Sequence, residues 1–186
     1  MTAHVGGYRA ERPGGAIIAT AYLVREATVA DAPVLARQRR LMFDAIDPLP
    51  ADEGDQLEAA VLRFILKAMP AGTFHAWVVE ATSGDGARII VAGGGLQLRT
   101  LMARPGHVHG DPEGLIVSMW TEPAHRRRGL GRLVVEAILA WGQANGVTRF
   151  TLHASDEGRP LYELFGFAPT NEMRRTFTRD DPDAVS

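Results

Sequence analysis

The sequence has no cysteine, no surplus of basic residues and no long hydrophobic run. Without cysteine among its 186 residues, the chain forms no disulfide, and thiolate metal sites and cysteine nucleophiles are excluded. Its 20 lysines and arginines against 22 aspartates and glutamates give a formal net charge of −2, which argues against a general nucleic-acid-binding protein. The apolar runs are far shorter than the ~20 residues of a membrane span. Residues 1–21 lack the order of a signal peptide, so a cytoplasmic location is expected.

The overall amino-acid composition is typical of a globular protein. Apolar residues make up 46% of the chain and charged residues 23%, and the length suits one domain with a full core. Residues 1–21 contain several glycines without clear periodicity and are predicted to be a flexible extension. A single domain is predicted over 22–179, followed by a disordered tail over 180–186.

Predicted strands and helices alternate within this domain. A Ser/Thr-x-x-acid pattern at Thr28–Asp31 resembles a capping box and marks a helix start, and apolar residues at helical spacing predict a second helix that stops before Pro70. The alternation predicts an α/β or α+β fold. The predicted strands are 22–25, 74–80, 88–99, 115–121, 149–153 and 167–178, the predicted helices are 28–46, 57–68, 129–145 and 159–165, and 104–114 is a predicted loop.

The most informative stretch is 115–141, where a buried strand is followed by a glycine turn and a helix. The turn has the sequence Arg126-Arg127-Arg128-Gly129-Leu130-Gly131. The apolar residues that follow are predicted to share one buried helix face; they are Leu130, Leu133, Val134, Ala137, Ile138 and Trp141. The first turn of a helix offers unpaired N–H groups and a partial positive charge, and glycines let a bulky anion approach them. These features indicate a phosphate site. A helix start with incidental glycines and solvated arginines is the alternative that these residues alone leave open.

Other interpretations of the arginine and glycine residues fit less well. A P-loop requires Gly-Lys-Ser/Thr, but Arg132 follows Gly131. A dinucleotide fingerprint requires a glycine three residues after Gly131, where Val134 stands. A nucleic-acid module would require further basic clusters, against the overall charge.

The motif Arg126-x-x-Gly129-x-Gly131 resembles the Arg/Gln-x-x-Gly-x-Gly/Ala signature of the GNAT superfamily of acetyltransferases. Upstream, residues 121–125 are similar to the strand end of that family. Downstream, residues 152–167 resemble its last conserved block, with a tyrosine four residues before Gly-Phe. The resemblance covers about residues 22–178 and implies a central mixed, mostly antiparallel, twisted sheet that is flanked by helices and splayed at its central strands. It also implies an acetyl-CoA-dependent N-acetyltransferase.

The resemblance further implies roles for the matching residues. Tyr162 would donate a proton to the departing CoA thiolate, which suits a phenol because its pKa of ~10 lies near the ~8.5 of a thiol. A half-buried packing aromatic is the alternative for this tyrosine. Ser155 stands where many members have an asparagine that contacts the cofactor, which leaves that contact open. The residues implied to bind acetyl-CoA, with CoA as the product, are Met119, Trp120 and Thr121 through the strand backbone and Arg127, Arg128, Gly129, Leu130, Gly131 and Arg132 through the loop.

The general base is left open by the sequence. Glu113, Glu80 and His153 are candidates, each with an ordinary structural or surface role as the alternative. Glu122 is next to the cofactor strand but is expected to point away from the cofactor. The chemistry implied is direct attack of an amine on the thioester, with no covalent enzyme intermediate, and a backbone N–H near Thr121 would polarise the carbonyl.

Two further features of the sequence are not predicted to take part in binding or catalysis. Gly93-Gly94-Gly95, within a predicted strand, indicates a bulge or a close approach rather than a phosphate loop. His107 and His109 lack a completing carboxylate pattern, so no metal is expected.

The expected partner is a small-molecule amine acceptor. The alternatives are acetylation of a peptide or protein amine, or a non-catalytic CoA-binding domain. Neither nucleic acid nor a membrane is expected as a partner, and a homodimer is left open.

Overall fold

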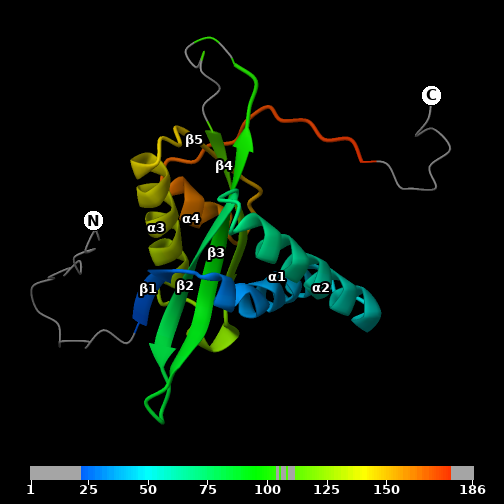
Figure 1. Cartoon of the computed structure of the whole chain (residues 1–186), viewed down its shortest axis with the longest axis vertical. Helices are drawn as coiled ribbons and strands as arrows, with labels where there is room; N and C mark the ends of the chain where they lie inside the picture. Colours follow the sequence, from blue (N-terminus) through cyan, green and yellow to red (C-terminus); the bar gives the residue numbers. More distant parts are fainter. Residues whose placement is uncertain (1–21, 104, 106–107, 109–111, 177–186) are drawn as a thin grey trace, which may run out of the picture. The chain divides into compact units, whose positions relative to one another are not determined.

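The structure is a computed structural model that describes residues 22–103, 105, 108 and 112–176 (Figure 1). The chain forms two compact units, the first ending at Leu152 and the second beginning at His153. The extension predicted over 1–21 and the tail predicted over 180–186 lie outside the described residues, as do His107 and His109. Among the described residues, no helix combines the length and apolar character needed to cross a membrane.

The described residues of the first unit form a five-stranded sheet and three α-helices. The strand order is β1-β2-β3-β4-β5, antiparallel from β1 to β4 and parallel between β4 and β5. This confirms the predicted mixed, mostly antiparallel sheet. The strands are β1 Tyr22–Glu26, β2 Phe74–Thr82, β3 Arg88–Thr100, β4 Pro112–Thr121 and β5 Arg149–Leu152, and the helices are α1 Ala32–Ile46, α2 Ala51–Ala68 and α3 Leu130–Ala144.

The sheet opens between its last two strands. β4 and β5 pair only from Glu113 opposite Arg149 to Ile116 opposite Leu152, whereas β4 continues to Thr121. Beyond Ile116, the β5-facing edge of β4 therefore has no strand partner among the described residues. This divergence is the predicted splay, and it leaves backbone N–H and C=O groups of β4 available for a ligand.

The three glycines of β3 allow close packing at a bulge opposite β4. The register of β3 and β4 shifts between Gly93 and Gly95, which confirms the predicted irregularity. A Cβ on Gly93 would lie 2.6 Å from Gln38 Oε1, and one on Gly95 would lie 2.5 Å from the Phe74 ring. A Cβ on Gly94 would collide with the Met119 side chain on the other face. Only glycine admits these neighbours on both faces.

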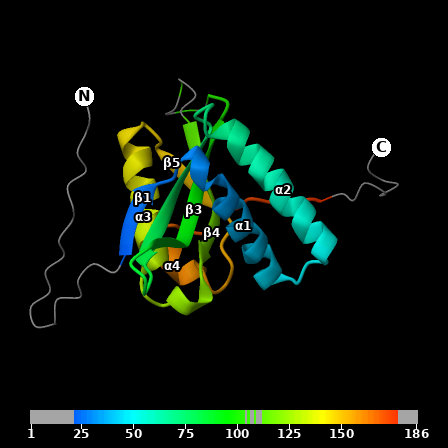
Figure 2. The same cartoon turned by 60° about the horizontal axis from the view of Figure 1, so that its bottom comes forward.

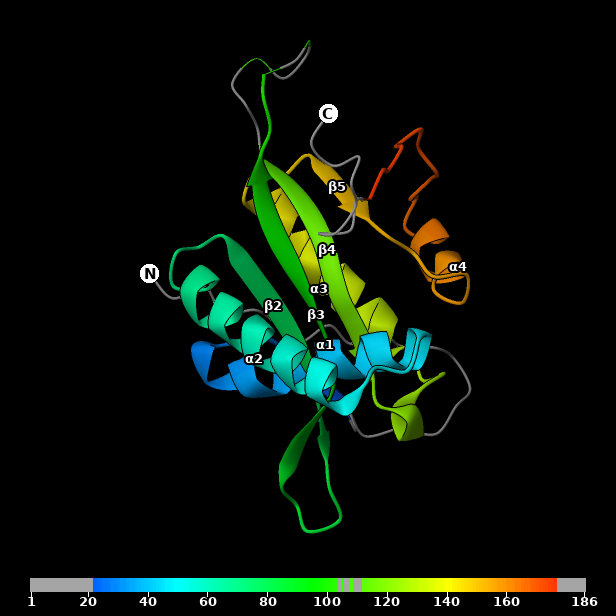
Figure 3. The ribbon, with the colours of Figure 1, turned by 90° about the vertical axis from the view of Figure 1, so that its right-hand side faces the viewer.

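Helices cover both faces of the sheet. Figures 2 and 3 show α1 and α2 side by side on one face and α3 on the opposite face. Leu130, Val134 and Ile138 of α3 are buried as predicted, but Leu133 is 37% exposed and Val135 is buried in its place. Periodicity identified the apolar stripe, but its exact edges depend on how the helix is rotated over the sheet.

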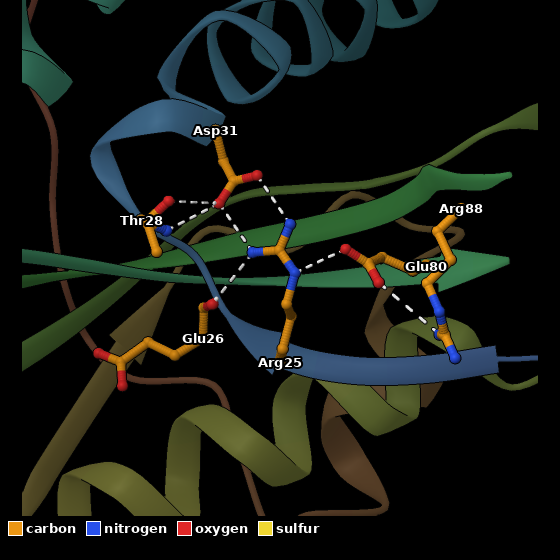
Figure 4. Close-up of polar contacts among 6 residues, drawn as sticks. All are labelled: Arg25, Glu26, Thr28, Asp31, Glu80 and Arg88. Atoms are coloured by element: carbon orange, nitrogen blue, oxygen red, sulfur yellow. Dashed lines mark hydrogen bonds and ion pairs between the residues drawn. The ribbon is translucent and has the colours of Figure 1, made fainter.

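The start of α1 is anchored by an ion-pair cluster around Arg25 of β1 (Figure 4). The Arg25 guanidinium donates to both carboxylate oxygens of Asp31 at 2.8 Å and to Glu80 of β2 at 2.6 Å. Asp31 also accepts the backbone N–H of Thr28 at 2.8 Å, the acidic half of the predicted capping box. These donors, the Arg25 hydrogen bond first, lower the pKa of Asp31 from 3.8 to about 2.

The starts of two elements, α2 and β4, differ from the prediction. Helix α2 begins at Ala51 rather than at residue 57, because Pro50 precedes its first turn and Asp52 and Glu53 suit the positive helix end. β4 begins at Pro112, within the predicted loop, because Pro112–Gly114 pair with the end of β3.

The strand predicted over 167–178 is wrong for its described part. Residues 167–176 form no strand, and residues 168–176 are exposed. An extended residue pattern becomes a strand only where a neighbouring strand offers hydrogen-bond partners. In the described part of the second unit, 153–176, lies one short helix, α4 Arg159–Glu163, as predicted near residues 159–165.

Candidate active site

The loop between β4 and α3 presents backbone N–H groups toward solvent. A 3-10 turn over Pro123–His125 leads into Arg127 and Gly129, whose left-handed φ values are 61° and 79°. The first α3 hydrogen bond is from Leu133 N to Gly129 O at 3.2 Å, so the N–H groups of residues 130–132 precede the helix ladder. Left-handed residues before a helix N-terminus form the concave array of N–H groups that binds anions. A Cβ on Gly129 would have no atom within 4 Å, so the array is open.

The arginines of this loop have different surroundings. Arg126 donates from Nε to Thr121 O at 3.1 Å, and its guanidinium lies 4.9 Å from the centre of the Trp120 ring. Arg128 donates to the Tyr22 hydroxyl at 3.2 Å. No carboxylate among the described residues pairs with Arg126, Arg127 or Arg128, so the positive charge of the loop is not neutralised. Such a loop attracts phosphate.

Arg132 differs from the other arginines because it forms an ion pair with Glu136 at 2.8 Å, one turn along the exposed face of α3. Its side chain is therefore engaged on the helix, which leaves the three preceding arginines as the cationic side chains of the loop. The backbone role that the resemblance implies for Arg132 stays a prediction.

Tyr22 of β1 contributes to the loop, a feature that sequence reasoning missed. Its hydroxyl lies 3.0 Å from His125 Nδ1 and accepts the Arg128 guanidinium, and the two rings of Tyr22 and His125 meet edge to face at 5.8 Å. Tyr22 is separated from these residues by more than 100 positions. No local pattern could have revealed the contact, because it exists only when β1 lies at the sheet edge beside the loop.

Met119, Trp120 and Thr121 occupy the end of β4 beyond the point where β5 diverges. Thr121 pairs with Ala92 and Trp120 with Gly93 on the β3 side, so their other edge faces the opening. The Thr121 carbonyl is partly occupied by Arg126 Nε. An extended ligand that pairs with this edge must therefore share the Thr121 carbonyl with Arg126 or displace the Arg126 hydrogen bond.

Ser155 and Tyr162 belong to the second unit. The Ser155 hydroxyl accepts the backbone N–H of Gly158 at 3.2 Å, and its carbonyl accepts that of Arg159 at 2.9 Å, so Ser155 shapes the turn before α4. Tyr162 is buried on α4, with the Phe167 ring edge to face at 6.0 Å. Burial raises the pKa of the Tyr162 phenol, which keeps it protonated at neutral pH. Their roles toward a cofactor stay predictions.

The candidate carboxylate bases differ in the ion pairs that their oxygens already form. Glu113 is buried and binds Arg99 and Arg149, each at 3.1 Å. Glu80 binds Arg25 at 2.6 Å and Arg88 at 3.7 Å. Both carboxylates are thus members of structural ion pairs, although neither is the solvated surface group of the alternative interpretation.

Glu122 and His153 complete the set of candidate bases. Glu122 has only a 3.8 Å contact with Arg37, which leaves it the least engaged of the three carboxylates. His153, in the second unit, lies 2.9 Å from the Arg174 guanidinium. Among the described residues, no three His, Cys, Asp or Glu side chains gather in a way that would hold a metal ion.

Comparison with known proteins agrees with this geometry. A GCN5-related N-acetyltransferase from Ralstonia eutropha JMP134 has 27% sequence identity and a TM-score of 0.72, with 84% of this chain and 98% of that chain covered. A predicted acetyltransferase with acetyl-CoA from Clostridium acetobutylicum has 22% identity and a TM-score of 0.69, covering 84% and 96%. Glucosamine-6-phosphate N-acetyltransferase from Arabidopsis thaliana has 17% identity and a TM-score of 0.59, covering 84% and 97%. The last two similarities concern the fold alone.

No curated protein matches the sequence. The family model described as the acetyltransferase (GNAT) family matches residues 42–167, which is more than half of the chain and includes the arginine and glycine loop, the end of β4 and Tyr162. The chain therefore belongs to the acetyltransferase (GNAT) family.

Proposed function

We propose that the protein is an acetyl-CoA-dependent N-acetyltransferase that transfers an acetyl group to the primary amine of a small molecule. The observation that carries this proposal is the loop before α3, where left-handed Arg127 and Gly129 and the N-terminal N–H groups of the helix form an open, cationic array. Its charge and shape suit a pyrophosphate. One solved structure with the same fold is described with acetyl-CoA, which supports this cofactor.

The proposed binding mode uses two parts of the site, the loop before α3 and the free edge of β4. The N–H groups of residues 127–132 bind the pyrophosphate, each contributing about 1.5–3 kcal/mol as a hydrogen bond to a charged oxygen. The free edge of Met119–Thr121 pairs with the pantetheine amides as an added strand would. Tyr22 holds His125 and Arg128, so it helps to fix the loop before the ligand arrives.

The proposed reaction has one transfer step. The neutral amine nitrogen forms a bond to the thioester carbonyl carbon, and the carbon–sulfur bond then breaks to release the CoA thiolate. A backbone N–H near Thr121 polarises the carbonyl, and Tyr162 donates its phenol proton to the sulfur. Before the attack, the ammonium loses one proton to a base reached through water. The second nitrogen proton, which is lost as the amide forms, passes through water to the Tyr162 phenolate and restores the phenol.

The experiment is acetyl transfer with thiol release as the readout. Purified protein is incubated with acetyl-CoA and, in separate arms, with small primary amines and with peptides that carry a free amino terminus or lysine. Release of CoA that depends on a small amine supports the proposal, with the acetylated product checked by mass. Transfer to peptides alone moves the acceptor to the alternative class, and acetyl-CoA binding without any transfer favours a non-catalytic domain.

A further inference from the structure

Arg39 differs from the other arginines of α1, which are Arg37 and Arg40. Arg40 forms ion pairs with Asp55 and Glu58, and Arg37 approaches Glu122. Arg39 is partly buried and has no carboxylate partner among the described residues. Burial lowers the pKa of its guanidinium, because removal of water disfavours the charged form. A partly buried cation without a counter-charge is uncommon unless a ligand supplies one.

The position of Arg39 is set by β4. Its Nη1 donates to Ser118 Oγ at 2.8 Å, and its guanidinium lies 5.0 Å from the centre of the Phe43 ring. Ser118 has a left-handed φ of 57° at the bulge between β3 and β4. A non-glycine residue with this backbone is unusual, and bulges commonly redirect a side chain beside a functional site. Here the bulge places the serine hydroxyl where it holds the guanidinium.

The same region contains two buried donors without an acceptor. Gln38 of α1 is 1% exposed, and neither its amide nitrogen nor its oxygen has a hydrogen-bond partner. Trp120 Nε1 is also buried and unpartnered. Trp120 lies opposite Gly93, whose Cβ position is next to Gln38, so both side chains are on the α1 face of the sheet. Buried polar groups are nearly always paired, so these two side chains require a further polar partner on this face of the sheet, which a water or a ligand group can supply.

We propose that Arg39, held by Ser118, binds an acidic group on the amine acceptor, so that the substrates are amines that also carry a carboxylate or a phosphate. This rests on the proposed acetyltransferase function. A guanidinium presents five N–H donors in a planar fork, and Ser118 uses one of them. The remaining donors match the paired oxygens of a carboxylate or phosphate. Ser118 directly precedes Met119–Thr121, so the bound acidic group lies beside the strand that binds the pantetheine arm.

The phosphates of CoA do not account for Arg39. They are assigned to the loop before α3, whereas Arg39 reaches β4 from α1. The two sites therefore make separable predictions for the two substrates: changes at Arg39 affect the acceptor, and changes in the loop affect acetyl-CoA.

The test compares amines in matched pairs. O-phosphoethanolamine is compared with ethanolamine, and γ-aminobutyrate with butylamine, by acetyl-CoA-dependent thiol release. For wild-type protein we expect kcat/KM to be higher for at least one acidic member than for its neutral partner, and the pair that responds distinguishes phosphate from carboxylate. In Arg39→Met we expect kcat/KM for that acidic amine to fall about 10- to 100-fold, as for the loss of a charged hydrogen bond. Its neutral partner and the KM for acetyl-CoA stay unchanged.

Three further variants sharpen the result. Ser118→Ala is expected to give a smaller loss in the same direction, because the guanidinium stays but is less well positioned. Arg39→Lys keeps the charge without the planar fork, is expected to be intermediate, and serves as the second variant should Arg39→Met fail to fold. Arg63→Met, which removes an exposed arginine from α2, is the control and is expected to match wild type.

The outcomes separate this proposal from the function on which it rests. Protein that binds acetyl-CoA but acetylates no acidic amine of the panel, or acetylates both members of each pair equally, overturns the acidic-acceptor proposal. An Arg39→Met variant with the same loss for both members, or with a raised KM for acetyl-CoA instead, also overturns it. Failure to bind acetyl-CoA overturns the proposed function itself.

Discussion

The phenol of Tyr162 is buried on α4, and desolvation keeps it protonated at neutral pH. Replacing it with phenylalanine retains the ring that meets Phe167 and removes only the hydroxyl. We expect Tyr162→Phe to lower kcat by about 100-fold or more, the lower end of general-acid contributions, with little change in acetyl-CoA affinity. Steady-state kinetics and isothermal titration measure the two effects. Wild-type turnover with an unchanged alkaline limb of the pH profile would reduce Tyr162 to a packing residue.

Tyr22→Phe is the matched comparison, because it removes a phenol hydroxyl from a different position. Its hydroxyl contacts His125 and Arg128 of the loop rather than a reacting atom. We therefore expect Tyr22→Phe to affect cofactor binding and not turnover. The KM for acetyl-CoA should rise several-fold, as for the loss of a hydrogen bond worth about 1 kcal/mol, while kcat stays nearly unchanged. Equal effects of the two variants on kcat would contradict the separate roles.

Gly131 provides a third prediction at a single residue. Glutamate at this position adds bulk and negative charge to the first turn of α3, where the pyrophosphate is proposed to bind. We expect Gly131→Glu to lower CoA affinity by at least 100-fold while circular dichroism stays as in wild type, a loss that corresponds to roughly 3 kcal/mol. Gly131→Ala, which adds only a methyl group to a helix, is the control. CoA affinity that survives in the glutamate variant would mean that the loop is not the phosphate site.

The cluster around Arg25 joins three elements, β1, β2 and the turn before α1. Asp31 has its pKa lowered from 3.8 to about 2, so the fold favours its ionised form. This stabilisation is present above the ordinary pKa of 3.8 and is lost as the pH falls through about 2. We expect Asp31→Asn to lower the free energy of unfolding by about 1–3 kcal/mol at pH 7.

Urea denaturation followed by circular dichroism between pH 2 and pH 7 tests this prediction. The difference between wild type and Asp31→Asn is expected to shrink as the carboxylate of the wild type becomes protonated. Asp47→Asn, at an exposed carboxylate that follows α1, is the control and is expected to be neutral. A difference that does not change with pH would indicate that the cluster acts through packing instead of charge.

Local sequence patterns identified most of the elements because their causes are local. Helix α3 follows from the spacing of its apolar residues, and the β2–β3 hairpin follows from two apolar segments around a glycine turn. The errors occurred where a distant partner decides the conformation. Pro112–Gly114 became strand because β3 pairs with them, whereas 167–176 did not, because no strand of the described residues pairs with them.

For the whole molecule, ligand binding and folding stability are linked. A ligand that binds only the native state at a hundredfold excess over its dissociation constant adds about 2.7 kcal/mol to the free energy of unfolding. For a chain of this size, we expect acetyl-CoA to raise the Tm by roughly 5–10 °C in a thermal scan. Pantetheine, which lacks the pyrophosphate, is the control and is expected to shift the Tm much less. An unchanged Tm at millimolar CoA would rule out the proposed cofactor.

Family membership and the candidate cofactor loop are encoded within short stretches of this chain. Arg126–Gly131 predicts an anion site without tertiary information, because the glycines, the arginines and the helix start are neighbours in sequence and their N–H groups converge through local backbone geometry. The lack of cysteine likewise excluded a covalent thiol mechanism directly.

Contacts between distant segments were decided only by the tertiary structure. Arg39 meets Ser118 across 79 positions, Tyr22 meets His125 across 103, and the two carboxylate oxygens of Glu113 form ion pairs with Arg99 and Arg149. Each contact depends on strand register, on a bulge or on the packing of a helix against the sheet. These arise only when the chain is folded, because they minimise the exposed apolar surface of the whole unit and not of any local segment.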